Sequence, residues 1–163
     1  MARIKVLIAD DHQVVRQGIS ALLSAQPDID VVGEATDGRE LIEFVEKLHP
    51  EVVLTDIAMP NLNGIDAACQ IRKRFPDVQV AILSMHPASS YVIRALRVGA
   101  LGYLLKNDDI EQVILAIRTI AQGRRYLSSQ VSEQVIDEFL SSKDAVTPLE
   151  ERITGRELEV LQL

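Results

Sequence analysis

The sequence of 163 residues predicts an α/β protein whose core is an open, doubly wound parallel sheet of five strands. Short apolar runs alternate five times with amphipathic helical patterns between residue 4 and residue 122. Most of these runs are nearly continuous in Val, Ile and Leu, which is typical of parallel strands covered on both faces. The length fits one domain of ordinary size plus an appendage.

The five expected strands have sharp boundaries in the sequence because polar residues or turn residues interrupt each apolar run. We expect strands at residues 4–9, 31–36, 52–55, 78–84 and 102–106.

Five helices are expected between and after these strands, because apolar residues recur at helical spacing. Asp37-x-x-Glu40 and Asp108-x-x-Glu111 resemble capping boxes and predict two of the helix starts. The stripes are Val15, Ile19, Leu22 and Leu23; Leu41, Ile42, Val45 and Leu48; Ile65, Ala68 and Ile71; Val92, Ala95 and Leu96; and Ile110, Val113, Ile114 and Ile117.

Composition excludes several classes of function. The net charge of −7 leaves no basic face of the kind that binding to nucleic acid requires. The single cysteine, Cys69, cannot form an internal disulfide or a cysteine-rich metal site, which suits a reducing compartment. No signal peptide and no run of about 18 apolar residues is visible, so we expect a cytoplasmic protein without membrane contact.

Polar side chains stand at the ends of four of the expected strands. The first strand is followed by Asp10 and Asp11, the third by Asp56, and the fourth and fifth end in Ser84 and Lys106. Each alone has an ordinary explanation as a cap, a turn or a solvated residue. Because the carboxyl ends of parallel strands form one edge, where such folds bind ligands, together they predict a functional site.

Three neighbouring carboxylates repel one another unless a cation compensates their charge. Mg²⁺ prefers such oxygen ligands, and carboxylates, Mg²⁺ and a lysine suit phosphoryl chemistry. Asp56 follows a central strand and is the best candidate for a nucleophile that forms an aspartyl-phosphate. The loop stiffened by Pro60 then allows a backbone carbonyl near Ala58 to reach the metal.

The motifs "IADDHQVVRQGI", "TDIAMPNLNGID", "ILSMH", "GALGYLLK" and "YLSS" together resemble a NarL/FixJ-like response regulator of two-component systems. The resemblance covers residues 3 to about 122, with every motif in order. It implies a flavodoxin-like (βα)5 receiver with strand order 2-1-3-4-5, followed by a helical linker.

The resemblance also implies roles for the residues at the strand ends. Asp56 would accept a phosphoryl group from a sensor histidine kinase. Mg²⁺ (or Mn²⁺) would be held by Asp10, Asp11, Asp56 and the Ala58 carbonyl. Lys106 would pair with the phosphoryl oxygens, and Ser84 would hydrogen-bond to them.

Tyr103 occupies the position of the family's switch aromatic. On this expectation, phosphorylation draws Ser84 inward and Tyr103 turns into the space it leaves. One departure is visible, because Asn107 stands where many receivers have proline after the lysine.

The three histidines, His12, His49 and His86, are dispersed along the chain, and we expect none of them to be catalytic.

The C-terminal part predicts an appendage. Residues 123–150 are expected to form an extra helix and a linker after the receiver of residues 1–122. Residues 151–163 resemble the truncated start of a LuxR-type helix-turn-helix domain, opened by Thr154-x-x-Glu157. Because the recognition helix would come later, we expect promoter DNA to bind the full-length regulator but not this chain.

The predicted function is therefore phosphorylation-activated regulation of transcription, with a homodimer formed on phosphorylation. A pseudo-receiver, acting through protein contacts alone, would be expected to lack an acid or the lysine, and none is missing. A phosphatase with an aspartate nucleophile needs a second aspartate where this chain has Ala58, which disfavours turnover. A nucleotide-binding module needs a glycine-rich turn after the first strand, where "ADDHQ" stands instead.

Overall fold

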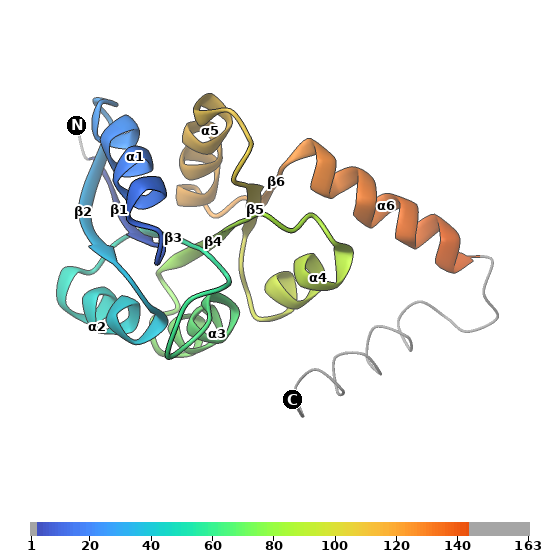
Figure 1. Ribbon diagram of the computed structural model, residues 1–163, viewed down its shortest axis with the longest axis horizontal. Helices are drawn as coiled ribbons and strands as arrows, with labels where there is room; N and C mark the ends of the chain where they lie inside the picture. The colour runs from blue at the N-terminus through green and yellow to red at the C-terminus, as the bar shows by residue number, and fades with distance from the viewer. Residues whose placement is uncertain (1–2, 144–163) are drawn as a thin grey trace.

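The computed structural model describes residues 3–143, and these residues form six strands and six helices in strict alternation (Figure 1). The strands are β1 (Ile4–Ala9), β2 (Ile29–Ala35), β3 (Val52–Thr55), β4 (Gln79–Ser84), β5 (Gly102–Leu105) and β6 (Tyr126–Leu127). The helices are α1 (Gln13–Ser24), α2 (Gly38–Leu48), α3 (Gly64–Arg74), α4 (Ser89–Arg97), α5 (Ile110–Ala121) and α6 (Ser129–Lys143). The predicted helix-turn-helix start at 151–163 lies outside the described residues.

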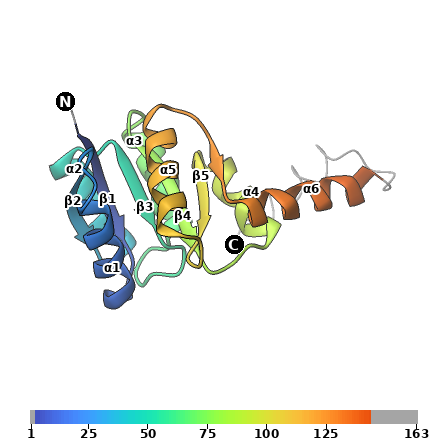
Figure 2. The ribbon, with the colours of Figure 1, turned by 90° about the horizontal axis from the view of Figure 1, so that it is seen from above.

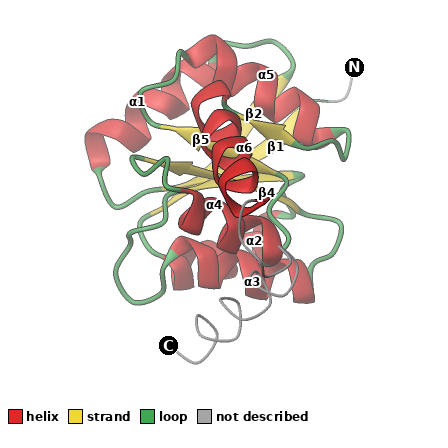
Figure 3. Cartoon of the chain, turned by 90° about the vertical axis from the view of Figure 1, so that its right-hand side faces the viewer, coloured by secondary structure: helices red, strands yellow, loops and turns green. Residues whose placement is uncertain are grey.

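The strands form one parallel sheet in the order β2-β1-β3-β4-β5-β6. Helices α1 and α5 cover one face, and α2, α3 and α4 cover the other (Figures 2 and 3). The predicted doubly wound α/β fold and the order of its first five strands are confirmed. The second strand begins at Ile29, two residues before the expected start, and its register against β1 shifts between Val6 and Leu7.

The sheet has six strands, so the expected count of five was wrong. Tyr126 donates its N–H to the Leu101 carbonyl at 2.9 Å, and Ser128 donates to the Tyr103 carbonyl at 3.1 Å. The physical reason is that the outer edge of β5 carries backbone groups that need partners. A strand of two residues is too short to give an apolar period, which is why the sequence did not predict it.

The hydrophobic core consists of two layers, one on each face of the sheet. Strand β3 has all four residues buried and supplies both layers: Val53 packs on the side of α2 and α3, whereas Val52 and Leu54 face α1 and α5. A strand that is buried on both faces has no polar side of its own, so polar residues beside it can occur only at its ends.

Helix α6 continues from β6 and projects away from the sheet (Figure 1). Its first turn is anchored by Val131, which is fully buried in the same core layer as Tyr103, and the helix packs against α4 and β5. Within residues 3–143, no helix has the length and apolar character needed to cross a membrane.

Two glycines allow a test of how tightly the loop after β3 is packed. A side chain at Gly64 would collide with the backbone carbonyl of Asp56, whereas nothing lies within 4 Å of a Cβ atom at Gly18, which is exposed in α1. We expect Gly64→Ala to lower the free energy of unfolding by about 1–3 kcal/mol. We expect Gly18→Ala to raise it by about 0.5–1 kcal/mol, because alanine favours a helix. Urea unfolding followed by circular dichroism measures both, and equal effects would contradict the packing described.

Candidate functional site

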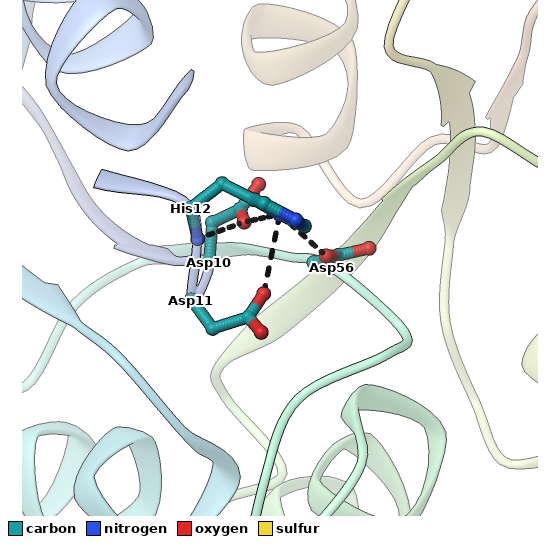
Figure 4. A group of neighbouring side chains, drawn as sticks. All are labelled: Asp10, Asp11, His12 and Asp56. Atoms are coloured by element: carbon teal, nitrogen blue, oxygen red, sulfur yellow. Dashed lines mark hydrogen bonds and ion pairs between the residues drawn. The ribbon is translucent and has the colours of Figure 1, made fainter. Parts of the chain in front are cut away.

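The carboxyl ends of the adjacent strands β1 and β3 bring together the acids predicted from the sequence. Asp10 follows β1, and Asp56 follows the adjacent strand β3, where its N–H donates to the Ala9 carbonyl at 2.9 Å. Both are nearly buried, with exposed fractions of 2% and 5%. Figure 4 shows Asp10, Asp11 and Asp56 grouped around His12, whose ring is joined to each of the three carboxylates by a dashed line.

Lys106, which follows β5, reaches across the edge to both buried acids. Its Nζ atom lies 2.9 Å from Asp10 Oδ2 and 3.0 Å from Asp56 Oδ2. The contact with Asp56 has the geometry of a hydrogen bond. In the described part of the chain, Asp10 Oδ2 has no hydrogen-bond partner although it is buried. One ammonium group therefore stands between two carboxylates, and a negative charge is left over.

The two acids respond differently to this environment. Burial raises the pKa of Asp56, and the Asp10 charge adds to this, while Lys106 opposes it without overcoming it. Burial also disfavours the charge on Asp10, but the close Lys106 ammonium and the hydrogen bond from the His12 backbone outweigh it and lower the pKa. Burial likewise acts against the charge on Lys106, yet its bonds to both acids raise its pKa. Asp56 is thus the acid whose charge is poorly compensated.

The backbone after β3 fixes the orientation of the Asp56 carboxylate. The N–H of Ile57 donates to Asp56 Oδ1 at 2.8 Å, and the N–H of Gly64 donates to the Ile57 carbonyl at 2.8 Å. Ile57 and Met59 are buried, whereas Ala58 between them is exposed. The loop is therefore anchored on both sides of Ala58. The role of the Ala58 carbonyl as a metal ligand stays a prediction.

Ser84 is the last residue of β4, Tyr103 lies within β5, and the two are linked through His86. Ser84 Oγ accepts the N–H of His86 at 2.9 Å, and the Tyr103 hydroxyl donates to the His86 carbonyl at 2.6 Å. Tyr103 is completely buried, and burial raises the pKa of its phenol while Ser84 opposes the shift. The His86 ring stacks on Tyr91 of α4 with centroids 5.2 Å apart. The aromatic ring is already turned inward in this structure.

Asp108 holds the loop that carries the lysine. Its carboxylate Oδ2 accepts the N–H of Leu105 at 2.9 Å, and its own N–H donates to the Leu105 carbonyl at 3.0 Å. These two bonds close the turn around Lys106 and Asn107 without a proline. The capping role expected for Asp108 therefore takes a different form, and Asp109 stands at the N-cap of α5.

His12 belongs to the cluster, although it was not among the site residues predicted from the sequence. Its Nδ1 atom lies 3.0 Å from Asp10 Oδ1, 3.2 Å from Asp11 Oδ1 and 4.0 Å from Asp56 Oδ2. The available signal was its place directly after the two acids, just before α1 begins. One ligand atom from each of these four residues lies within 4.8 Å of the others, a spacing that a metal ion could bridge.

Arg16 is a second residue that the sequence analysis did not single out. Its Nη1 atom donates to the Asp10 carbonyl at 2.8 Å, and its Nε atom donates to Glu34 Oε1 at 3.0 Å. Its side chain is only 12% exposed. Helix α1 thereby holds the turn that carries Asp10 and Asp11 against β2.

The donor set fits a hard divalent cation. Carboxylate oxygens are the ligands that Mg²⁺ prefers, and the two buried acids here share one ammonium, that of Lys106. A cation beside Asp56 would also compensate the charge that raises its pKa. Asp10, Asp11 and Asp56 could therefore hold a metal ion.

Comparisons with known proteins agree with this arrangement. Residues 6–118 match the response regulator receiver domain family. The transcriptional regulatory protein DegU of Brevibacillus brevis is 39% identical over 175 residues, covering 99% of this chain and 74% of that protein. LiaR of Bacillus subtilis is 39% identical over 160 residues, covering 98% and 75%. The chain thus spans about three quarters of the length of these relatives.

Solved structures give the same result. A LuxR-family two-component response regulator from Aurantimonas sp. SI85-9A1 superposes with a TM-score of 0.82 at 30% identity, over 85% of this chain and 99% of that one. The signal receiver domain of NarL from Mycobacterium tuberculosis gives 0.74 at 33% identity, over 76% and 100%. The chain belongs to the response regulator receiver family, and its receiver is of the type found in NarL/LuxR-like, phosphorylation-activated two-component regulators.

Proposed function

We propose that Asp56 is the phosphoacceptor, and that a sensor histidine kinase in the cytoplasm supplies the phosphoryl group in a reaction that depends on Mg²⁺ or Mn²⁺. The observation that carries this proposal is the buried, poorly compensated carboxylate of Asp56, with Lys106 Nζ 3.0 Å away and Asp10 and Asp11 beside it. The phosphorylated residue then switches a DNA-binding output.

In the transfer step, an Asp56 carboxylate oxygen forms a bond to phosphorus as the phosphorus–nitrogen bond to the kinase histidine breaks. The imidazole keeps the electron pair of that bond and gains a proton from solvent. Ile57 N–H holds Oδ1 throughout, so the nucleophile is oriented before the donor arrives. The product is an acyl phosphate on the end of a central strand.

The metal, when bound by Asp10, Asp11, Asp56 and the Ala58 carbonyl, supplies positive charge beside the phosphoryl oxygens. Lys106 would supply a second positive charge, since its ammonium already contacts Asp56 Oδ2. Ser84 contributes a hydroxyl at the end of β4, next to β3. These groups bind charge that develops on the phosphoryl group and need no further proton transfer.

The same residues favour a persistent phosphoryl group over an enzyme that turns over. An aspartate-nucleophile phosphatase uses an acid two residues after the nucleophile, and here Ala58 offers only a methyl group. At most, slow self-dephosphorylation by water is expected. A pseudo-receiver that acts only through protein contacts is the alternative, and the geometry disfavours it because both buried acids and the lysine are in contact.

The output route proposed here runs from Ser84 and Tyr103 to the face made by α4, β5 and α5 (residues 89–122). Tyr103 contacts the loop before α4 through its hydroxyl and the start of α6 through its backbone carbonyl, which accepts the Ser128 N–H. A shift of Tyr103 would therefore reach both helices. RcsB, which is similar in structure at 28% identity and a TM-score of 0.76, is known as two dimers bound to DNA. We propose that this regulator likewise binds promoter DNA in its full-length form.

The first prediction concerns the phosphoacceptor. Incubation with acetyl phosphate and Mg²⁺ should add the mass of one phosphoryl group, because Asp56 is the oriented, poorly compensated acid. Intact mass spectrometry measures this. Asp56→Asn and an EDTA-treated sample should gain nothing, whereas Asp77→Asn, a matched change of an exposed aspartate, should behave as the parent. A parent that binds Mg²⁺ without gaining mass would favour the pseudo-receiver.

The second prediction follows from the raised pKa of Asp56. Between the ordinary aspartate pKa of about 4 and the raised value, the folded protein keeps a proton that the unfolded chain has released. The stabilisation from this retained proton is complete at pH values below that window, and it is lost as the pH rises through the window. Without metal and near neutral pH, Asp56→Asn should therefore raise the free energy of unfolding by an amount on the order of 1 kcal/mol.

Urea unfolding in EDTA across that pH range measures the difference, which should shrink toward pH 4. Asp77→Asn serves as the control and should show no comparable trend. A less stable Asp56→Asn protein at neutral pH would contradict the electrostatic account of the site.

The third prediction concerns the output. Beryllium fluoride, the phosphoryl mimic used with the isolated RcsB receiver, should raise the sedimenting mass of this chain toward a dimer when Mg²⁺ is present. Asp56→Asn should remain unchanged under the same conditions. In a longer form of the protein, release of the DNA-binding domain is the alternative response. Identical masses together with unchanged contacts to that domain would overturn the proposed output.

A further inference from the structure

We propose that His12 is an additional ligand of the metal site, and that its imidazole makes the site prefer nitrogen-accepting divalent transition ions such as Co²⁺ and Ni²⁺ over Mg²⁺. This inference rests on the metal site of the proposed function. It adds a nitrogen donor, which increases the selectivity for these ions beyond that of oxygen ligands alone.

The separations between His12 and the acids fit neighbouring positions around one ion. In an octahedral shell with bonds of about 2.1 Å, adjacent ligand atoms lie about 3.0 Å apart and opposite atoms about 4.2 Å apart. His12 Nδ1 is 3.0 Å from Asp10 Oδ1, 3.2 Å from Asp11 Oδ1 and 4.0 Å from Asp56 Oδ2. Two contacts have the spacing of adjacent ligands, and the third is close to that of opposite ones.

A separate observation indicates that the cluster is short of positive charge. Asp10 is 98% buried, and its Oδ2 atom has no hydrogen-bond partner within residues 3–143. Burying a carboxylate oxygen without such a bond is costly, and the nearby Lys106 ammonium is shared with Asp56. An ion at the cluster would add positive charge to two buried acids that share this one ammonium.

Ligand chemistry then gives the direction of the selectivity. Mg²⁺ is a hard ion that takes oxygen ligands, so an imidazole adds little to its affinity. Imidazole suits iron, nickel, copper and zinc, and affinity for nitrogen and oxygen sites rises from Mn²⁺ through Co²⁺ and Ni²⁺ to Cu²⁺. His12 therefore increases the affinity for Co²⁺ more than the affinity for Mg²⁺.

Substitution of His12 can separate this role from a structural one. The bond from its backbone N–H to Asp10 Oδ1, 2.8 Å long, survives any side-chain change other than proline. Its ring is 63% exposed and makes no side-chain cap to α1, so His12→Ala opens no cavity. His49→Asn is the matched control, because His49 precedes β3 at the opposite edge of the sheet and asparagine tolerates its left-handed backbone.

The experiment is calorimetric titration of the untagged 163-residue chain, its His12→Ala variant and its His49→Asn variant with Mg²⁺ and with Co²⁺. In the parent, Co²⁺ should bind more tightly than Mg²⁺. His12→Ala should reduce the ratio of the two affinities at least about tenfold, since even partners that only orient a ligand are worth ten- to a hundredfold. His49→Asn should leave the ratio unchanged. The Co²⁺ complex of the parent should also show a far-shifted imidazole N–H proton by NMR, absent from His12→Ala.

Three results would overturn the inference while leaving the proposed phosphoacceptor site intact: an unchanged affinity ratio in His12→Ala, no shifted imidazole proton, or tighter binding of both ions by the variant. Tighter binding of both ions by His12→Ala would mean that the His12 ring, hydrogen-bonded to the acids, occupies the place of the cation in the parent. A parent that binds neither ion would instead overturn the metal site itself and the inference with it. The titration of the parent alone distinguishes loss of the whole metal site from failure of the His12 inference.

Discussion

The structure depends on one electrostatic constraint, which is the burial of two carboxylates, Asp10 and Asp56, around the single ammonium of Lys106. Two negative charges and one positive charge at low exposure cannot be balanced internally, and the fold must hold them together against repulsion. The backbone does this at three places. Ile57 N–H fixes one acid, Arg16 fixes the turn of the other, and Asp108 closes the loop of the lysine.

This imbalance connects stability with function. A site that lacks one positive charge favours a cation, because a cation would gain affinity from the same repulsion that destabilises the free protein. The pKa of Asp56 is raised mainly by burial, and the repulsion from Asp10 adds to the shift. Tyr103 and Ser84 are bonded to the same short segment at His86, so a movement of either side chain changes the loop before α4. A change of charge at the acids of the strand ends can thereby alter the packing of the loop before α4.

Much of the fold was predictable because burial on both faces leaves a simple pattern. The run Val52–Thr55 has no polar alternation, and that alone indicates a central parallel strand with its chemistry at the end. Asp10, Asp56 and Lys106 could be placed together because parallel strands share an edge. His12 and Arg16 could not, since their positions depend on how α1 is rotated above the acids, which apolar spacing does not specify. Strand β6 escaped prediction because its two residues are held by backbone bonds that no side-chain pattern records.

The pairing of β6 with β5 has a consequence for self-association. Without Tyr126 and Leu127, the carbonyls of Leu101 and Tyr103 would lie open along an apolar strand, where a strand of another molecule could pair with them. The linker thus protects the edge of the sheet as well as leading away from it. A receiver cut after residue 122 would lose this protection together with the buried Val131, and strand-to-strand aggregation would compete with its folding.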